Sequence, residues 1–140
     1  MGFRKADVRT TADAFKNTSV VFSLFTLQFL PEKDRLPLVK RIYEGLNEGG
    51  VFILSEKVQA KNAKFQEMLT FIYYDFKKKN FSEKDILDKE QSIRDQMKLW
   101  SEYKIFEMLR SAGFAGVNLQ LFWRNHLFVG IVAAKAAQYR

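Results

Sequence analysis

The sequence of 140 residues contains no cysteine and a single histidine. The absence of cysteine excludes a disulfide framework and a thiolate metal site, and it fits a reducing compartment. No apolar run approaches the roughly 20 residues that a membrane-spanning helix needs, and the first residues lack the apolar core of a secretory signal. We therefore expect a cytoplasmic protein that does not enter a membrane.

The charge is strongly positive, at +7, but it is not concentrated in one place. The one basic run, Lys77 to Lys79, is explained by a solvated helix end, because cations favour helix C-termini. A basic RNA-binding module remains an open alternative. The even spread of the charge does not favour direct binding of tRNA.

Short apolar runs alternate with helical patterns along the chain. Strands are expected at 20–24, 51–54, 117–121 and 127–134, and helices at about 34–46, 65–76, 82–97 and 101–112. The first strand–helix–strand unit needs a right-handed crossover, so its two strands should be parallel. The last two strands should form an antiparallel hairpin that turns at 124–125. The sequence therefore predicts one α/β domain over residues 1–140.

Several residues mark the ends of the expected helices. Asp34 can cap the first helix, Ser82 and Asp85 can form a capping box, and Gly113 can end the last helix. The helix at 65–76 carries apolar residues outside its main stripe, including Phe71 and Tyr74. This pattern predicts that the helix buries two faces.

The segment VVFSLFTLQFL at 20–30 joins an apolar strand directly to a mixed loop. Ligands of open α/β sheets bind outside the carboxyl ends of the strands, so this loop should line a pocket. Plain core packing beneath the loop is the alternative for its apolar residues, which are Phe25, Leu27, Phe29 and Leu30.

A set of short motifs occurs along the chain in a fixed order. They are ADVR at 6–9, FTLQFL at 25–30, IYEGLNEGG at 42–50, LSEK at 54–57, DFK at 75–77, FSE at 81–83 and AGF at 112–114. In order and spacing the set resembles the carboxy-S-adenosylmethionine synthase family, over essentially the whole chain. The resemblance implies the C-terminal half of a class I methyltransferase sheet, which is Rossmann-like. Two parallel strands and an antiparallel terminal hairpin would be flanked by helices.

The resemblance also implies a reaction. Members of this family use S-adenosylmethionine and prephenate to make carboxy-S-adenosylmethionine, which serves the modification of the tRNA wobble uridine. Because a sulfonium ylide is the nucleophile, the protein mainly binds, orients and neutralises charge. We accordingly assign no catalytic residue and no metal ligand.

Parts of the family's cofactor site are missing from the sequence. The Gly-rich turn after the first strand and the acidic residue after the second are absent. We expect an incomplete domain that lacks the N-terminal cofactor-binding half and is inactive as this chain, so its status as an enzyme stays open. A non-catalytic remnant that acts by self-association is the alternative.

The remaining cofactor positions are carried over from the family residue by residue. Asp7 and Val8 match the pair that contacts adenine, and Leu24 stands where the family has an asparagine. Ser23 should point to the opposite face of the strand. Glu90 stands where the family has an arginine that reads the added carboxylate, and Arg94 lies one helical turn further on.

Five other side chains are weaker candidates. His126 is interpreted as an exposed turn residue, and Trp100 as a core anchor. Trp123 is a candidate for stacking on a base. Glu56 and Lys57 end the second strand, where they would serve a pocket or form a local ion pair.

The strand from Val20 to Leu24 would lie in mid-sheet in a full methyltransferase fold. Without a preceding strand its edge is unpaired, apolar and uncharged, and it lacks the usual protections of an edge strand. A missing N-terminal half is one partner that would cover it. We expect a homo-oligomer that associates through this edge.

Overall fold

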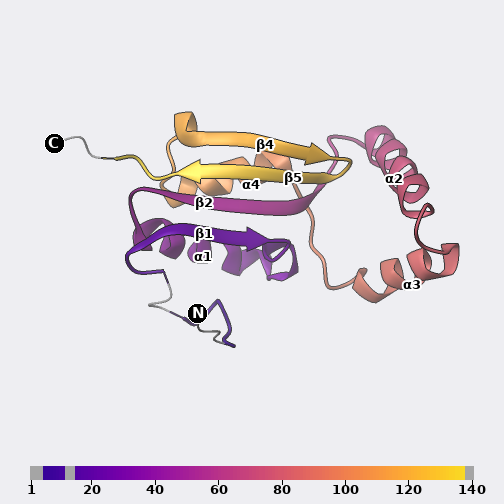
Figure 1. Cartoon of the computed structure of the whole chain (residues 1–140), viewed down its shortest axis with the longest axis horizontal. Helices are drawn as coiled ribbons and strands as arrows, with labels where there is room; N and C mark the ends of the chain where they lie inside the picture. Colours follow the sequence, from indigo (N-terminus) through magenta and orange to yellow (C-terminus); the bar gives the residue numbers. More distant parts are fainter. Residues whose placement is uncertain (1–4, 12–14, 138–140) are drawn as a thin grey trace.

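Figure 1 shows the computed structural model of the chain, which describes residues 5–11 and 15–137. The elements are β1 (Thr18–Leu24), α1 (Glu32–Gly45), β2 (Leu46–Gln59), α2 (Ala63–Lys77), α3 (Glu83–Ile93), β3 (Trp100–Ser101), α4 (Glu102–Ala112), β4 (Leu119–Asn125) and β5 (Phe128–Ala134), with 3-10 turns at Leu27–Phe29 and Gly116–Asn118. The expected order of helices and strands is therefore present, with the two-residue strand β3 added.

The sheet has the strand order β1-β2-β5-β4. β1 and β2 are parallel, and Phe22 lies opposite Ile53 in their register. β2 and β5 are antiparallel, as are β4 and β5. The predicted parallel pair and the terminal hairpin are both confirmed, but the hairpin turns at residues 126–127 rather than at 124–125.

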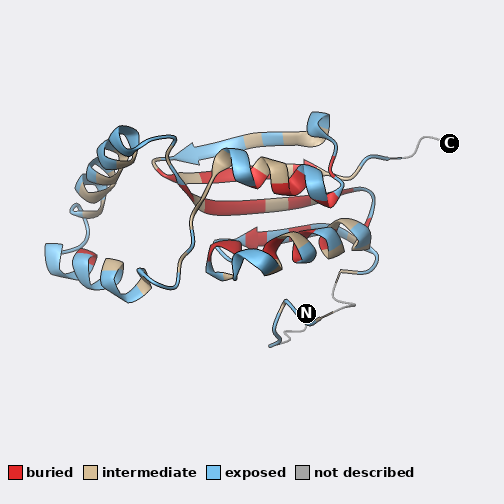
Figure 2. Ribbon diagram, turned by 180° about the vertical axis from the view of Figure 1, so that it is seen from behind, coloured by how far each residue is buried: buried red, intermediate tan, exposed pale blue. Residues whose placement is uncertain are grey.

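The core lies between the sheet and two helices, α1 and α4, which cover one face (Figure 2). Side chains alternate between the two faces of a strand, so Phe52 and Leu54 of β2 point into this core and are fully buried. Val39 of α1 and Leu109 of α4 meet them from the helical side and are also fully buried. This packing holds the carboxyl ends of β1 and β2 in place.

The opposite face of the sheet is open in the part of the chain that the structure describes (Figure 1). Val20, Phe22 and Leu24 alternate onto it and are 44%, 64% and 57% exposed. Among the described residues of β1, Val21 and Ser23 alone are buried. Ser23 does point away from Leu24, as expected, and β1 is an edge strand.

The ends of the helices follow the sequence signals with two exceptions. The capping box of Ser82 and Asp85 is present, and α4 ends at Gly113, whose φ is +119°. Pro31 occupies the N-cap position of α1, which has no side-chain cap, and Asp34 lies in the first turn of the helix instead. α3 ends at Ile93 rather than near residue 97.

α2 and α3 form an arm that extends beyond the end of the sheet (Figure 1). α2 was expected to bury two faces, but none of its residues, all of them described, is buried. The reason is position, because the arm meets the sheet only near the ends of β2 and β5, and its apolar stripe faces cavities rather than a core. Among the described residues, no helix is long and apolar enough to cross a membrane.

Candidate functional site

A cleft of about 420 Å³ opens where the carboxyl ends of β1 and β2 meet the arm. Its walls come from the loop after β1, the end of β2, the start of β5, and both helices of the arm. The side chains that matter for its chemistry are Phe25, Lys57, Tyr73, Lys77, Glu90 and Phe128. We call it the β1–β2 cleft. Its position agrees with the expectation that the loop after β1 lines a pocket.

The loop after β1 is fastened to β2 by a buried carboxylate. Oε1 of Glu56 accepts the N–H of Leu27 at 3.0 Å, and Oε2 accepts the N–H of Gln28 at 2.8 Å. Oε1 of Gln28 in turn accepts the N–H of Lys57 at 2.7 Å. Phe25, whose φ is +53°, donates its N–H to the carbonyl of Ser55 at 2.7 Å. These contacts explain why the strand runs directly into a loop of defined shape.

Arg35 fastens the loop from its other side. Its guanidinium donates to the carbonyl oxygens of Leu30 at 3.0 Å and Lys98 at 2.7 Å, and it lies 4.6 Å from the ring centroid of Trp100. The N–H of Lys98 donates to the carbonyl of Gln28 at 2.9 Å. The chain that returns from the arm is therefore bound to the loop after β1. Trp100 packs against the core, which fits its interpretation as an anchor.

Burial is the main cause of the pKa shifts of Glu56 and Arg35. The Glu56 side chain is 3% exposed, and burial raises its pKa to about 7, although the two N–H groups that it accepts and the nearby Arg35 oppose this shift. Burial likewise lowers the pKa of Arg35. Glu56 is thus a structural anchor beneath the cleft, and neither of its two expected roles, pocket residue or local ion-pair partner, describes it fully.

The cleft is lined by three lysines, Lys57, Lys77 and Lys89, and by one carboxylate, that of Glu90. Nζ of Lys77 lies 3.1 Å from Oε1 of Glu90 and 4.4 Å from the centroid of the Tyr73 ring. Nζ of Lys57 lies between Tyr73 and Phe128, 5.8 Å and 5.9 Å from their centroids. Burial lowers the pKa of Lys57, because a charged amine is poorly solvated there. The lysines suit an anionic ligand, and Glu90 opposes one.

The three cofactor residues expected from the sequence lie elsewhere. Asp7 is in an exposed loop and pairs with Arg9 at 2.6 Å, and hydrogen bonds from Arg9 lower its pKa to about 2. The carbonyl of Val8 accepts a hydrogen bond from Arg41 of α1 at 2.8 Å. Leu24 ends β1 and faces solvent. The described residues that line the cleft include none of these three.

Other expectations are corrected or sharpened by the structure. Glu90 does line the cleft, whereas Arg94 lines a neighbouring cavity of about 350 Å³. His126 is half-buried rather than exposed, with its ring 5.6 Å from those of Tyr73 and Phe76. Trp123 is 40% exposed on β4. Among the described residues, no group of three or more His, Cys, Asp or Glu is placed to hold a metal ion.

Sequence reasoning did not assign Tyr73 and Lys77 to a pocket. They are four residues apart on α2 and therefore share one face of the helix. Neither residue was part of the apolar stripe expected for this helix, and Lys77 was assigned to a solvated helix end. The structure instead places both side chains in the lining of the cleft.

The sequence is similar to those of several curated proteins that share one name. Two curated relatives, both named carboxy-S-adenosyl-L-methionine synthase, are 40% identical over 122 residues (Staphylococcus epidermidis) and 35% identical over 134 residues (Nitratiruptor sp.). These matches cover 86% and 95% of this chain but 53% and 54% of the relatives. The chain thus spans about half the length of the curated relatives it matches. No family model matches it.

A solved structure supports the fold independently. Human N-acetylserotonin methyltransferase, determined in complex with SAM, matches with a TM-score of 0.62 at 16% identity. The match covers 96% of this chain and 34% of the methyltransferase. At this identity the likeness concerns the fold alone. It confirms the expected α/β fold of a class I methyltransferase.

The buried carboxylate leads to a prediction about pH. Because the pKa of Glu56 in the folded chain, about 7, lies above its usual value of 4.5, the folded state binds more protons between these values. The stability that this extra proton provides is fully present below pH 4.5 and is lost as the pH rises through 7. The free energy of unfolding should fall by about 2–3 kcal/mol over this range. Urea unfolding at pH 5 and pH 8 should show this loss, and Glu56→Gln should remove most of it. The exposed Glu48→Gln is the matched control, and an unchanged pH dependence in Glu56→Gln would contradict the prediction.

Proposed function

Because this chain is a relative of the carboxy-S-adenosyl-L-methionine synthases, we propose that it forms the substrate-side half of an S-adenosylmethionine-binding domain. The other half, with the Gly-rich turn, would have to be supplied by further sequence. In this proposal the complete protein converts S-adenosylmethionine and prephenate to carboxy-S-adenosylmethionine for tRNA wobble uridine modification. The chain described here is inactive alone.

One observation carries this proposal, namely the β1–β2 cleft at the carboxyl edge of the sheet. Open α/β sheets bind their ligands there, and the loop that forms the cleft is held by Glu56 and Arg35 rather than left mobile. Aromatic walls from Phe25, Tyr73 and Phe128 suit a ring-bearing substrate.

The chemistry requires that negative charge be neutralised. In the proposed reaction prephenate loses its ring carboxylate as carbon dioxide and its hydroxyl group as hydroxide, which leaves phenylpyruvate. The hydroxide takes a proton from the sulfonium methyl and becomes water. The carbon of the resulting ylide forms a bond to the carbon of carbon dioxide, so the product gains a carboxylate. Lys57, Lys77 and Lys89 are the cations that line the cleft and would face such a group. Glu90 already forms an ion pair with Lys77. This lysine is therefore less available to the carboxylate of the product.

The first prediction of the proposal concerns cofactor binding. The chain alone should bind S-adenosylmethionine no more tightly than in the millimolar range, because the Gly-rich half of the pocket is absent from its sequence. A fusion that adds the unmatched half of the Staphylococcus epidermidis relative should bind it at least about 100-fold more tightly. Isothermal titration measures both. Low-micromolar binding by the chain alone would refute the idea of a half-site, and a fusion that folds without binding would refute the proposed function.

The second prediction concerns the charge at position 90. Replacement Glu90→Arg should raise the affinity of that fusion for carboxy-S-adenosylmethionine about 10- to 100-fold relative to S-adenosylmethionine, since one charge-assisted pair contributes roughly 1.5–3 kcal/mol. Glu90→Gln should give a smaller gain by removing the repulsion alone. The exposed Glu83→Arg adds the same charge outside the cleft and should leave the ratio unchanged. If Glu90→Arg leaves it unchanged too, position 90 does not read the carboxylate.

A second candidate function is self-association, which the open face of the sheet favours. β1 is an edge strand with apolar residues exposed on it, and neither lysine nor proline interrupts it. In this alternative the chain is a non-catalytic remnant that pairs with a second copy through the residues from Val20 to Leu24. A missing N-terminal half would compete for the same edge.

Light scattering tests this alternative. The purified chain should be a dimer or larger, and Phe22→Lys should shift it toward monomer by placing a charge on the open face. Phe22 is the suitable position because Val21 is buried against the helices, where a lysine would disrupt the core. Val117→Lys adds the same charge at a 94% exposed site away from β1 and should have no effect. A monomeric unmodified chain would rule self-association out.

A further inference from the structure

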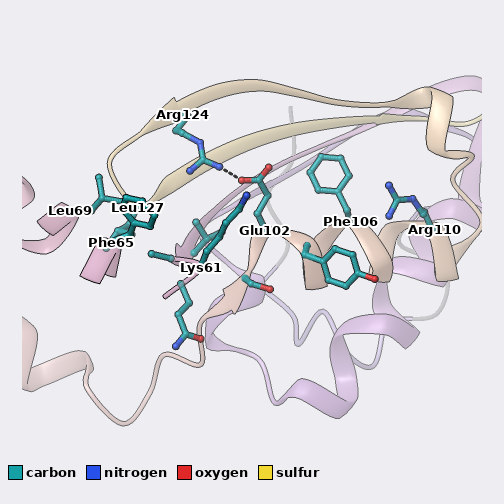
Figure 3. Close-up of a pocket in the computed structure, with 13 residues that line it drawn as sticks. Lys61, Phe65, Leu69, Glu102, Phe106, Arg110, Arg124 and Leu127 are labelled. Atoms are coloured by element: carbon teal, nitrogen blue, oxygen red, sulfur yellow. Dashed lines mark hydrogen bonds and ion pairs between the residues drawn. The ribbon is translucent and has the colours of Figure 1, made fainter. Parts of the chain in front are cut away.

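A second cavity of about 500 Å³ lies between the start of α2 and the start of α4 (Figure 3). We call it the α2–α4 groove. Its walls are apolar and aromatic, with Phe65 and Leu69 on α2, Phe106 and Tyr103 on α4, and Leu127 at the hairpin turn. A volume of this size and an apolar lining are typical of a site for a small molecule.

The groove is separate from the β1–β2 cleft, although the two are neighbours. Successive residues of a strand point to opposite faces of a sheet, and Lys57 lines the cleft while Val58 lines the groove. In the same way Phe128 lines the cleft and Leu127 lines the groove. A ligand in one cavity therefore meets different side chains from a ligand in the other.

Basic groups from three different elements surround the groove. Lys61 precedes α2, Arg110 belongs to α4, and Arg124 ends β4. Glu102 is the single acidic residue of the lining, and Figure 3 shows it facing Arg124, with which it forms an ion pair. The lining therefore carries a formal charge of +2, from three cations and one anion. This balance suits an anionic ligand.

The two guanidinium groups are held in position before any ligand arrives. Arg110 pairs with Glu107 at 2.5 Å and lies 5.8 Å from the ring centroid of Phe106. Because a guanidinium has five N–H donors, one carboxylate does not exhaust its capacity to bind an anion. A planar charged group beside a half-buried ring is also suited to stacking.

The backbone around the groove is likewise fixed. The N–H of Ala60 donates to Oε1 of Gln66 at 2.9 Å, and the N–H of Val58 donates to the carbonyl of Leu127 at 2.7 Å. On the facing wall, the side chain of Ser101 caps α4 through the N–H of Lys104 at 3.2 Å. The groove is thus preformed, which lowers the cost of ordering it around a ligand.

From these observations we propose that the α2–α4 groove is a second binding site, which takes a flat aromatic molecule bearing one anionic group. The ring would lie against an aromatic side chain of the lining, and the anion would face its cations. Aryl carboxylates and nucleoside monophosphates share this chemistry. The proposal is independent of the function proposed for the β1–β2 cleft, because it rests on a different set of residues.

The test is a residue-resolved NMR titration of the chain with three probes. They are 2-naphthoate, the neutral 2-naphthamide and adenosine monophosphate. Amide signals of Lys61, Tyr103 and Phe106 should shift with the anionic probes, and 2-naphthoate should bind at least about fivefold more tightly than 2-naphthamide. Tighter binding of 2-naphthoate would identify the ligand as an aryl carboxylate, and tighter binding of adenosine monophosphate would identify a nucleotide. Both results support the site.

Charge-removing variants make the assignment specific. Lys61→Gln and Arg110→Gln should each weaken binding of the preferred anionic probe about threefold to tenfold. Lys104→Gln removes the same charge from α4 but faces Glu32 rather than the groove, and it should leave binding unchanged. Three results would each overturn the proposal. The neutral probe binds as tightly as the anionic probe, the shifted signals are confined to Lys57 and Tyr73 or to Phe22 on the open face, or every variant binds like the unmodified chain.

Discussion

The two hydrogen bonds that the Glu56 carboxylate accepts from the loop after β1 are the interaction on which the rest of the site depends. They satisfy the backbone N–H groups of two buried residues in the loop, Leu27 and Gln28. The same contact places Gln28 where it can bind the backbone of Lys57 and the chain that returns from the arm. A single buried side chain therefore connects the edge strand, the central strand and the arm, and the cleft lies where these three meet.

Much of the fold was predictable because its signals are local. Alternating apolar runs, the capping box at Ser82 and Gly113 with its left-handed backbone each specify an element without reference to the rest of the chain. The parallel pairing of β1 and β2 followed from the handedness of the crossover. The misjudged features are the ones that depend on neighbours. The periodicity of α2 shows that one face is apolar, but not that this face meets cavities rather than a core.

The candidate site was predictable only in part, for the same reason. The loop after β1 and the position of Glu90 followed from the family motifs, and the structure brings both to the cleft. The anchoring role of Glu56 was not visible, because it needs two N–H groups from residues about thirty positions away. The pairing of Lys77 with Glu90 likewise joins two helices whose relative position no local pattern specifies. Val8 matched a motif, yet the structure places it beside α1, away from the cleft.

The arm formed by α2 and α3 is inserted between β2 and β5, which are hydrogen-bonded neighbours although the arm, α4 and β4 separate them in sequence. The entropy lost on closing such a connection grows only with the logarithm of its length, by about 0.6 kcal/mol for each doubling. The sheet is consequently almost indifferent to how long the arm is. Evolution is free to lengthen, shorten or reshape this segment, and with it both cavities, while the strand pairing that defines the fold stays the same.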